Sequence, residues 1–552
     1  MIEAKIIDHE QERKNDIDII KNSSYPRKVV VSGPGTGKSY LFQEVIKKKK
    51  EDGKENFLAI TFMGKLCDGL ADDLAGLVEA KTLHGFARKF VKDHCSGEWE
   101  YYPKMMEIIK EDLKIKGIVN SEIGDNNYKE RTLYYKAVGH DDVIYYAVQI
   151  CKKDKNKIPE YDLILVDEFQ DFNETEAEFI DLLATKNEIL IVGDDDQALY
   201  RFKGSFSKFI KDKHDKSNTN FESHTLKYCS RCTEVIINAF HNIIDHFSSK
   251  GKIKNRINDK KLIYYPPDKK EDSDLNQKLF LLKSVTSGSI PTKIKYELLS
   301  VIERQKIKSV LIIGEARTCK MLLSSIAIGL KEFGFRSVDH DRCHRRTFFS
   351  KSHVIEGYKI LIKKLNDVLA WRLLLKEIGD KSEIKKIILD NYDNSKDFIE
   401  AIPEDFKNEQ EKNAKTLMRI LKNPESGRKQ IALSSIEALL EHITMEEKEK
   451  RKIFIDQLID DNKYITRPLA DLDIVVGNIL GAKGLEADVV FLVGFDQGKL
   501  PMKDNVEDSE IYQMIVALTR AKKRVYLINT VGIKVSQFID CIDKDFIETK
   551  VY

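Results

Sequence analysis

Apolar runs with the length of buried strands recur along the chain, and longer stretches of mixed polar and apolar residues separate them. One group is KVVVSG (28–33), FLAIT (57–61), LILVD (163–167) and EILIVGD (188–194), and the other is SVLIIGE (309–315), LDIVVGN (472–478), DVVFLVGF (488–495) and RVYLIN (524–529). Strands rich in Val, Ile and Leu, with little alternation, are typical of parallel sheets covered by helices on both faces. The pattern predicts two α/β domains.

Two segments interrupt this strand pattern, at about residues 91–160 and 339–470. They are rich in Lys and Glu and carry few strand signals, which favours helices. We therefore expect each α/β domain to contain a helical insertion.

Composition excludes some classes of protein and leaves others open. The chain has 552 residues, 42% of them hydrophobic, and its 92 Lys and Arg nearly balance its 90 Asp and Glu, so net charge neither indicates nor excludes a nucleic-acid partner. No apolar run reaches the roughly 18 residues of a membrane span, and the charged N-terminus lacks a signal-peptide core, so we expect a cytoplasmic protein without a membrane partner. The only CxxC, Cys229–Cys232, has no second pair to complete a zinc site, and we interpret it as two ordinary thiols.

The stretch KVVVSGPGTGKSYL (28–41) combines a strand, a Gly-rich turn and a helix start. Glycines at 33, 35 and 37 allow the backbone to approach closely, so that N–H groups and a helix N-terminus can surround phosphate oxygens. In such a cradle Lys38 reaches the β- and γ-phosphates and Ser39 binds Mg²⁺. The strict motif has glycine where this chain has Ser32, but the rest is intact and predicts a nucleotide site.

A second strand, in YDLILVDEFQDF (161–172), ends in several carboxylates. Adjacent carboxylates repel one another and gain nothing by burial, so a positive partner is expected against them. Mg²⁺ beside Lys38 is that partner in our interpretation. Asp167 then holds the metal, and Glu168 acts as the general base on the attacking water.

Further strings occur together in a fixed order. They are TFMGK (61–65), TLHGF (82–86), VDEFQD (166–171), VGDDDQALYRFKGS (192–205), LGAKGLEADVVFLVGF (480–495) and VALTRAKKRVYL (516–527). With the phosphate cradle they resemble the ordered motifs of the UvrD/Rep-type superfamily 1 DNA helicases. The resemblance implies an α/β fold of two RecA-like P-loop motor domains, each interrupted by a helical subdomain. The expected boundaries are 1–90 and 161–225 for the first motor domain, 91–160 for its insertion, 226–338 and 471–552 for the second motor domain, and 339–470 for its insertion.

The resemblance also assigns roles at the nucleotide site. Gln197 is similar to the γ-phosphate sensor, Arg231 and Arg520 are similar to arginines that reach the phosphate from the second domain, and Glu486 is similar to a ribose-binding carboxylate whose loop Lys483 helps to shape. The remaining nucleotide-binding candidates are Gln11, Gly33, Gly35, Thr36, Gly37, Lys38, Ser39, Tyr40 and Gly484. The base site departs from the family, because Tyr40 and Ser230 stand where an arginine and a tyrosine often hold adenine, and Gln11 lies farther from Lys38 than expected.

A DNA track is implied in the same way. Aromatic and small polar side chains match positions at which the family contacts bases and backbone, and stacking on aromatic rings tolerates any sequence. These candidates are Thr61, Phe62, Thr82, His84, Tyr200, Phe202 and Lys203.

The resulting prediction is an ATP-dependent DNA helicase or translocase that uses ATP and Mg²⁺ and moves 3′→5′ on single-stranded DNA or on DNA with a single-stranded tail. A nuclease or repair protein is a further expected partner. The alternative is a helicase-like ATPase subunit of an anti-phage defence complex that regulates or feeds a separate nuclease. A nucleotide-gated interaction module that does not move on DNA is a third interpretation, and the intact Glu168, Arg231 and Arg520 argue against it.

Overall fold

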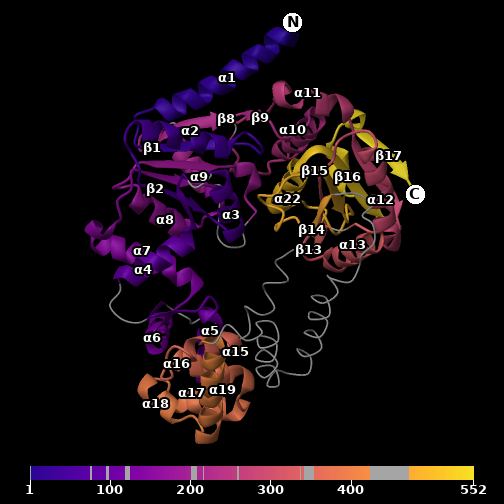
Figure 1. Ribbon diagram of the computed structural model, residues 1–552. Helices are drawn as coiled ribbons and strands as arrows, with labels where there is room; N and C mark the ends of the chain where they lie inside the picture. The colour runs from indigo at the N-terminus through magenta and orange to yellow at the C-terminus, as the bar shows by residue number, and fades with distance from the viewer. Residues whose placement is uncertain are drawn as a thin grey trace. The chain divides into compact units, whose positions relative to one another are not determined.

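The computed structural model describes residues 2–74, 77–94, 99–118, 125–199, 208–215, 217–257, 260–335, 337–340, 353–422 and 472–552. These residues form two compact units. The sheet unit takes its residues from Met1–Phe90, Ala147–Asp341 and Arg467–Tyr552, and the helical unit from Val91–Tyr146 and Arg342–Thr466. In Figure 1 the sheet unit carries the two sheets, and the helical unit contains α15 to α19.

The first sheet has six described strands in the order β3-β2-β6-β7-β1-β8, and every neighbouring pair is parallel. Its strands are β1 (Arg27–Ser32), β2 (Phe57–Thr61), β3 (Glu79–Thr82), β6 (Leu163–Val166), β7 (Ile189–Gly193) and β8 (Glu222–Leu226). The associated helices are α1 (Ile2–Asn22), α2 (Lys38–Glu51), α3 (Gly64–Asp73), α4 (Leu83–His94), α7 (His140–Lys153), α8 (Glu174–Leu183) and α9 (Lys208–His214). Apolar side chains of α1 and α2 pack in one core with alternate residues of the central strands, among them Val30 and Val192.

The second sheet has seven described strands, also all parallel, in the order β13-β14-β12-β15-β16-β11-β17. They are β11 (Leu279–Val285), β12 (Ser309–Gly314), β13 (Ser337–His340), β14 (Asp473–Asn478), β15 (Ala487–Val493), β16 (Ala521–Thr530) and β17 (Ile547–Val551). A short pair, β9 (Tyr228–Cys229) and β10 (Ile263–Tyr264), joins the two parts of this unit.

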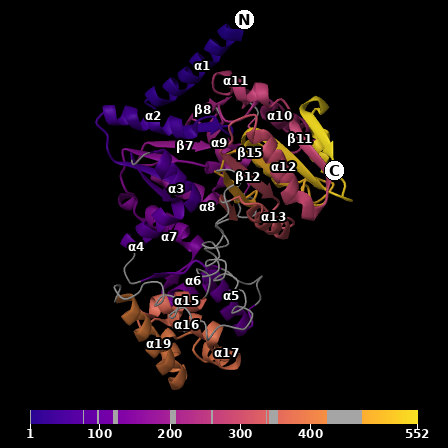
Figure 2. The ribbon, with the colours of Figure 1, turned by 45° about the vertical axis from the view of Figure 1, so that its right-hand side comes forward.

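Helices cover both faces of the second sheet. Val310 and Ile312 of β12 pack in one core with α12 (Ile290–Ile302) and α13 (Lys320–Glu332), whereas Leu311 and Ile313 pack in another with α10 (Glu234–Ser249) and α22 (Asp508–Thr519). Both views place α12 and α13 beside this sheet (Figures 1 and 2). Successive side chains of a strand point to opposite faces, so a strand buried twice must be apolar throughout. The predicted α/β class with two parallel sheets is confirmed, while the four-part division of the chain stays a prediction.

The helical unit contains α5 (Met105–Lys116), α6 (Asp125–Tyr135), α15 (His353–Leu361), α16 (Val368–Ile378), α17 (Lys381–Asp390), α18 (Ser395–Glu400) and α19 (Glu404–Lys422), with the short strands β4 (Glu100–Tyr101) and β5 (Ala137–Val138). Its core joins residues that are far apart in the sequence, such as Ile108 and Trp371. Among the described residues, no helix is both long and apolar enough to cross a membrane.

A buried charge cluster connects α5, α6 and α16 inside the helical unit. Asp112 accepts hydrogen bonds from Arg131 Nη2 at 2.9 Å and from Arg372 Nη2 at 3.0 Å, and all three side chains are buried. We expect Asp112→Ala to lower the free energy of unfolding of this unit by about 3–5 kcal/mol, because it leaves two buried guanidinium groups without their main counter-charge. Hydrogen exchange of the α5 and α16 amides measures this, and Asp393→Ala, at an exposed position, is the matched control. Unchanged protection in Asp112→Ala would contradict the prediction.

Candidate active site

The turn between β1 and α2 has the backbone of a phosphate cradle. Gly35 has φ 66° and Gly37 has φ 90°, a left-handed conformation that L side chains rarely adopt. Gly37 is the N-cap of α2, so Lys38 begins the helix. The first backbone N–H groups of a helix have no partner inside it, and they give the cradle donors for an anion.

Residues that follow β8 pack closely against this cradle. A Cβ at Gly35 would lie 2.3 Å from the Cβ of Arg231, and one at Gly33 would lie 2.5 Å from Leu262 Cδ1. The Ser230 N–H donates to the Gly35 carbonyl at 2.9 Å. Glycine is therefore required at 33 and 35 by packing as well as by phosphate approach. Thr36, another predicted nucleotide residue, donates its hydroxyl to the Gly33 carbonyl at 3.0 Å and so stabilises the turn.

The carboxylates at the end of β6 meet Lys38. Lys38 Nζ lies 2.5 Å from Glu168 Oε1 and 3.7 Å from Asp167 Oδ1. The sequence predicts a positive charge at this strand end, and in this structure the Lys38 ammonium itself supplies it. Burial raises the pKa of Asp167 to about 6, although Lys38 opposes that shift.

Glu168 is held in an unusual conformation by several partners. Its φ is 54°, in the left-handed region, which is costly for a residue with a side chain. Gln170 Nε2 donates to Glu168 Oε2 at 2.6 Å, and Lys483 Nζ lies 3.4 Å from the same oxygen. Burial alone would raise the pKa of Glu168, but the Lys38 and Lys483 ammonium groups overcome it and hold that pKa below its usual range. The carboxylate is thus ionised and fixed in place.

The predicted sensor contacts a predicted arginine from the second sheet. Arg520 Nη2 donates to Gln197 Oε1 at 2.8 Å, and Gln197 Nε2 donates to Asp194 Oδ2 at 2.7 Å. Arg520 is 3% exposed. Burial, reinforced by the nearby Arg231, lowers the pKa of Arg520 to about 10, so the guanidinium stays charged near neutral pH.

The other predicted arginine and the predicted ribose carboxylate bind each other. Arg231 Nε donates to Glu486 Oε2 at 2.8 Å, and Lys522 also pairs with Glu486. Burial raises the pKa of Glu486, but Arg231 and Lys522 outweigh it and hold that pKa below its usual range. Gly484, in the same loop, has φ 82°, and a Cβ there would lie 2.2 Å from Leu66 Cδ2.

Lys483 has a role that the sequence does not reveal. The motif predicts only that it helps to shape its loop, but its ammonium is buried between the two sheets, where it pairs with Asp171 and donates to the Gln197 carbonyl at 2.8 Å. Burial raises the pKa of Asp171 to about 7 even with Lys483 beside it. No motif spacing distinguishes a buried lysine from an exposed one, so nothing in the sequence could have assigned this contact.

The metal-ligand candidates carry hard oxygen donors, which suit Mg²⁺. Ser39 Oγ now donates to Asp73 Oδ2 of α3 at 2.5 Å, and Asp167 lies next to Lys38. A hydroxyl and a carboxylate on either side of the lysine are compatible with a metal that bridges phosphate oxygens.

At the expected base end, one residue outside our candidates touches the cradle. Arg13 Nη2 lies 3.3 Å from the position that a Cβ at Gly37 would take, and its guanidinium lies 4.6 Å over the ring of Tyr265. Gln11 instead donates to Asn15 Oδ1 one turn along α1, at 2.8 Å. Tyr40 is 47% exposed on the first turn of α2. The base-binding roles of Gln11 and Tyr40 stay predictions, and Arg13 joins them as a candidate.

Four DNA candidates lie at the carboxyl ends of β2 and β3. Thr61 and Thr82 are paired across the two strands, and Thr82 Oγ1 accepts from the Gly85 N–H at 3.0 Å. The buried Thr61 hydroxyl has no hydrogen-bond partner among the residues that the structure describes. The ring of Phe62 meets the ring of Phe172 edge-on, with centroids 5.7 Å apart, and His84 Nε2 lies 3.6 Å from Glu176 Oε1.

The other three DNA candidates, Tyr200, Phe202 and Lys203, lie outside the described residues. The DNA-binding roles of all seven stay predictions.

Comparison with known proteins adds independent information. A family model described as an AAA domain matches residues 17–203, and one described as a UvrD-like helicase C-terminal domain matches residues 349–532. The chain is 23% identical to a probable DNA helicase II homolog of Mycoplasma genitalium, over 94% of this chain and 85% of the relative. It is 26% identical to the ATP-dependent DNA helicase Rep of Buchnera aphidicola subsp. Baizongia pistaciae, over 66% and 60%. It is 27% identical to one subunit of the ATP-dependent helicase/nuclease of Lactococcus lactis, over 38% and 18%.

Proposed function

This chain belongs to the UvrD/Rep-type superfamily 1 helicases, and we propose that it is an ATP-driven motor that moves 3′→5′ on single-stranded DNA. One observation carries the proposal: polar groups from both sheets converge on the cradle. Lys38 and Glu168 come from the first sheet, and Arg520 reaches Gln197 from the second. ATP bound between them would be hydrolysed only where the two sheets meet.

Hydrolysis begins with a change of partner at Lys38. The phosphate oxygens of ATP compete with Glu168 for the ammonium, which now lies 2.5 Å from that carboxylate. Loss of this contact removes part of the charge that depresses the pKa of Glu168, so the carboxylate becomes a better base. Glu168 then accepts a proton from the attacking water, while Gln170 and Lys483 keep it oriented.

Ser39 and Asp167 would hold Mg²⁺ beside the phosphates. The bound metal would neutralise charge on the β- and γ-phosphate oxygens. Ser39 is available for this through exchange of its present contact with Asp73, which is at the exposed surface.

Coupling to movement follows from the origin of the charges. Arg520 and Arg231 neutralise charge that develops on the γ-phosphate, and such guanidinium groups act only when they are brought against it. Both belong to the chain after β8, whereas the cradle belongs to β1 and α2. Turnover therefore depends on closure of the second sheet on the first, and release of products reopens them.

The experiment that tests this function is steady-state ATP hydrolysis by the purified chain, alone, with single-stranded DNA and with single-stranded RNA. Strong stimulation by DNA supports the motor, and a fluorescent strand-displacement assay with 3′ and 5′ tails then tests polarity. A folded protein that binds ATP without any stimulation would refute the motor and favour an ATPase that a protein partner controls.

The aromatic track gives a prediction for one side chain. We expect Phe202→Ala to reduce the ratio of DNA-stimulated to unstimulated ATP turnover and to weaken DNA binding, because stacking on a ring contributes about 1–3 kcal/mol per base. Titration of ATPase activity with oligo(dT) measures both effects. Phe209→Ala, at a position farther along the chain and outside the predicted track, is the control. A wild-type ratio in Phe202→Ala would count against the track.

A helicase-like protein that feeds a separate nuclease, as in an anti-phage defence complex, is the second candidate. Its support is the likeness to a helicase/nuclease subunit, which covers 38% of this chain. Purification of a tagged chain from its own cells, followed by a nuclease assay of the eluate, tests it. If no nuclease co-purifies, this candidate is dropped.

A further inference from the structure

Three consecutive aspartates follow β7 and are fully buried. One oxygen of each of Asp194, Asp195 and Asp196 lies within 4.8 Å of the others, and all three are 0% exposed. Like charges this close and this dry are strongly unfavourable without a cation. The sequence motif that contains them assigns a role only to its glutamine, Gln197.

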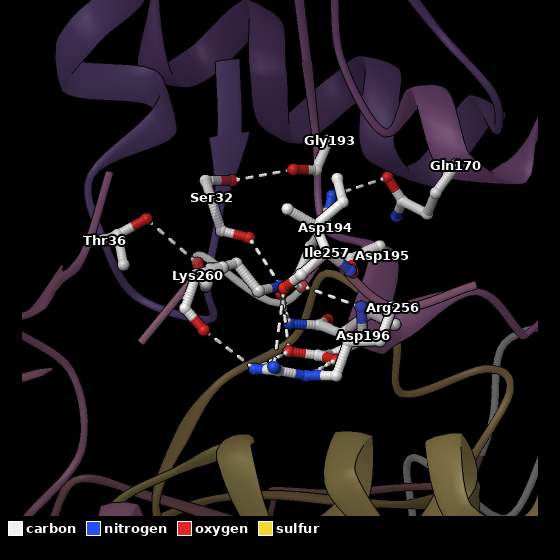
Figure 3. Close-up of polar contacts among 12 residues, drawn as sticks. Ser32, Thr36, Gln170, Gly193, Asp194, Asp195, Asp196, Arg256, Ile257 and Lys260 are labelled. Carbon is white, nitrogen blue, oxygen red and sulfur yellow. Dashed lines mark hydrogen bonds and ion pairs between the residues drawn. The ribbon is translucent and has the colours of Figure 1, made fainter. Parts of the chain in front are cut away.

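A single lysine satisfies all three carboxylates. Lys260 Nζ lies 2.7 Å from Asp194 Oδ1, 2.6 Å from Asp195 Oδ1 and 2.9 Å from Asp196 Oδ2, and its side chain is 1% exposed (Figure 3). A second cation, Arg256, donates to Asp196 Oδ1 at 2.8 Å. Burial raises the pKa of Asp195, whereas at Asp196 burial is outweighed by Lys260 and Arg256, which hold that pKa below its usual range.

The lysine is connected to the sensor through only one of the three aspartates. Asp194 Oδ1 accepts from Lys260, and Asp194 Oδ2 accepts from Gln197 Nε2 at 2.7 Å. The Gln197 amide is thereby oriented with Oε1 toward Arg520, which donates to it at 2.8 Å. The carboxylates of the other two aspartates are engaged elsewhere in the described part of the chain, Asp195 by the Ile257 N–H and Asp196 by Arg256.

Two further contacts place the same aspartate near the general base and the cradle. The Asp194 N–H donates to Gln170 Oε1 at 2.8 Å, and Gln170 Nε2 donates to Glu168 at 2.6 Å. Lys260 Nζ also donates to the carbonyl of Ser32, at 3.4 Å, immediately before the phosphate turn. Lys260 lies far along the chain from all of these, 66 residues after Asp194.

We propose that Lys260 is a positioning residue for ATP hydrolysis: by occupying Asp194 Oδ1 it leaves Oδ2 for Gln197 and so fixes the sensor amide toward Arg520. This inference rests on the proposed function of the nucleotide site. Lys260 itself contacts no reacting atom and acts through Asp194. A purely structural role would require only that the charge of the aspartate cluster be balanced.

The two roles are separated by restoring the charge without restoring the contact. Lys260→Met removes one positive charge, and Asp195→Asn in the same chain removes one negative charge, so the double variant has the net charge of the wild type. The asparagine introduced at position 195 keeps an oxygen acceptor for the Ile257 N–H, which now donates to Asp195 Oδ2 at 2.6 Å. Asp194 still lacks its lysine in this variant.

We expect the double variant to unfold at nearly the wild-type temperature and to keep KM for ATP within about twofold, while kcat falls about 10- to 100-fold, the scale of a misplaced catalytic group. The matched control is Arg256→Met with Asp195→Asn, which makes the same charge change in the same cluster. Arg256 contacts Asp196 but not Asp194, so kcat is expected to remain near that of the wild type.

The outcomes are distinct. Recovery of kcat together with thermal stability in the Lys260 double variant would overturn the proposal in favour of charge balance alone. An equal loss of kcat in the Arg256 control would overturn it as well. All of these variants are compared by their turnover without DNA, so absence of DNA stimulation in the wild type would count against the motor function only.

Discussion

Replacing Glu168 by glutamine is expected to lower ATP turnover by about 10²- to 10⁴-fold while ATP binding is retained. The amide has nearly the same shape but cannot accept the proton of the attacking water. It also removes one of the two carboxylates beside Lys38, so the ammonium is freed for phosphate, and affinity for ATP should not fall. The variant is therefore expected to accumulate in the ATP-bound state.

Two measurements check this expectation: steady-state hydrolysis, and equilibrium binding of a fluorescent ATP analogue. Glu297→Gln is the matched control, because Glu297 is also a buried glutamate paired with a lysine, Lys550, but belongs to α12 of the second sheet. It should keep wild-type turnover. Wild-type turnover in Glu168→Gln itself would refute the general-base assignment.

The central strands were predictable because burial on both faces demands continuous apolar runs. KVVVSG and LILVD correspond to β1 and β6, which lie inside the first sheet. The edge strands β3 and β8 have the sequences EAKT and ESHTL, whose polar residues are tolerated where a strand has only one neighbour. Polar composition gives no strand signal, so these edges could not be read from the pattern.

One internal strand was missed for a different reason. β11 has the sequence LFLLKSV and lies between β16 and β17, but Lys283 and Ser284 interrupt its apolar run. Ser284 has φ 62°, and the pairing with β16 shifts register between Leu282 and Val285. A bulge places the polar pair outside the regular ladder, and this irregularity depends on tertiary contacts that local pattern does not encode.

The candidate site divides along the same line. The cradle residues and Glu168 follow from local motifs, because phosphate binding needs a particular backbone at a particular spacing. The cations that neutralise the buried carboxylates come from elsewhere in the chain: Lys260 for Asp194 and Lys483 for Asp171. Lys260 is buried and its neighbour Lys261 is exposed, yet both stand in NDKKLIYY without any distinguishing pattern. Only the fold reveals which lysine is the partner.

Arg520→Ala is expected to lower kcat by about 10³- to 10⁵-fold, the range measured for arginines that neutralise transferring phosphate. Its guanidinium is the group of the second sheet that contacts the sensor, 2.8 Å from Gln197 Oε1, and it remains charged although burial lowers its pKa to about 10. The charge is needed most when negative charge develops on the γ-phosphate, so the transition state loses more than the ground state. Affinity for ATP should change far less than kcat.

Arg520→Lys distinguishes charge from shape. Lysine keeps the positive charge but not the planar fork, which in Arg520 donates at once to Gln197, to the Leu485 carbonyl at 3.2 Å and to the Val516 carbonyl at 3.2 Å. We therefore expect partial recovery of kcat over alanine. Arg524→Ala, in the same strand β16, is the control for loss of an arginine from this sheet, because Arg524 contacts Asn276 and not the sensor. Thermal unfolding of each variant separates folding from catalysis. An equal loss of kcat and of ATP affinity in Arg520→Ala would show that the arginine binds the ground state, and then closure of the second sheet could not be what gates hydrolysis.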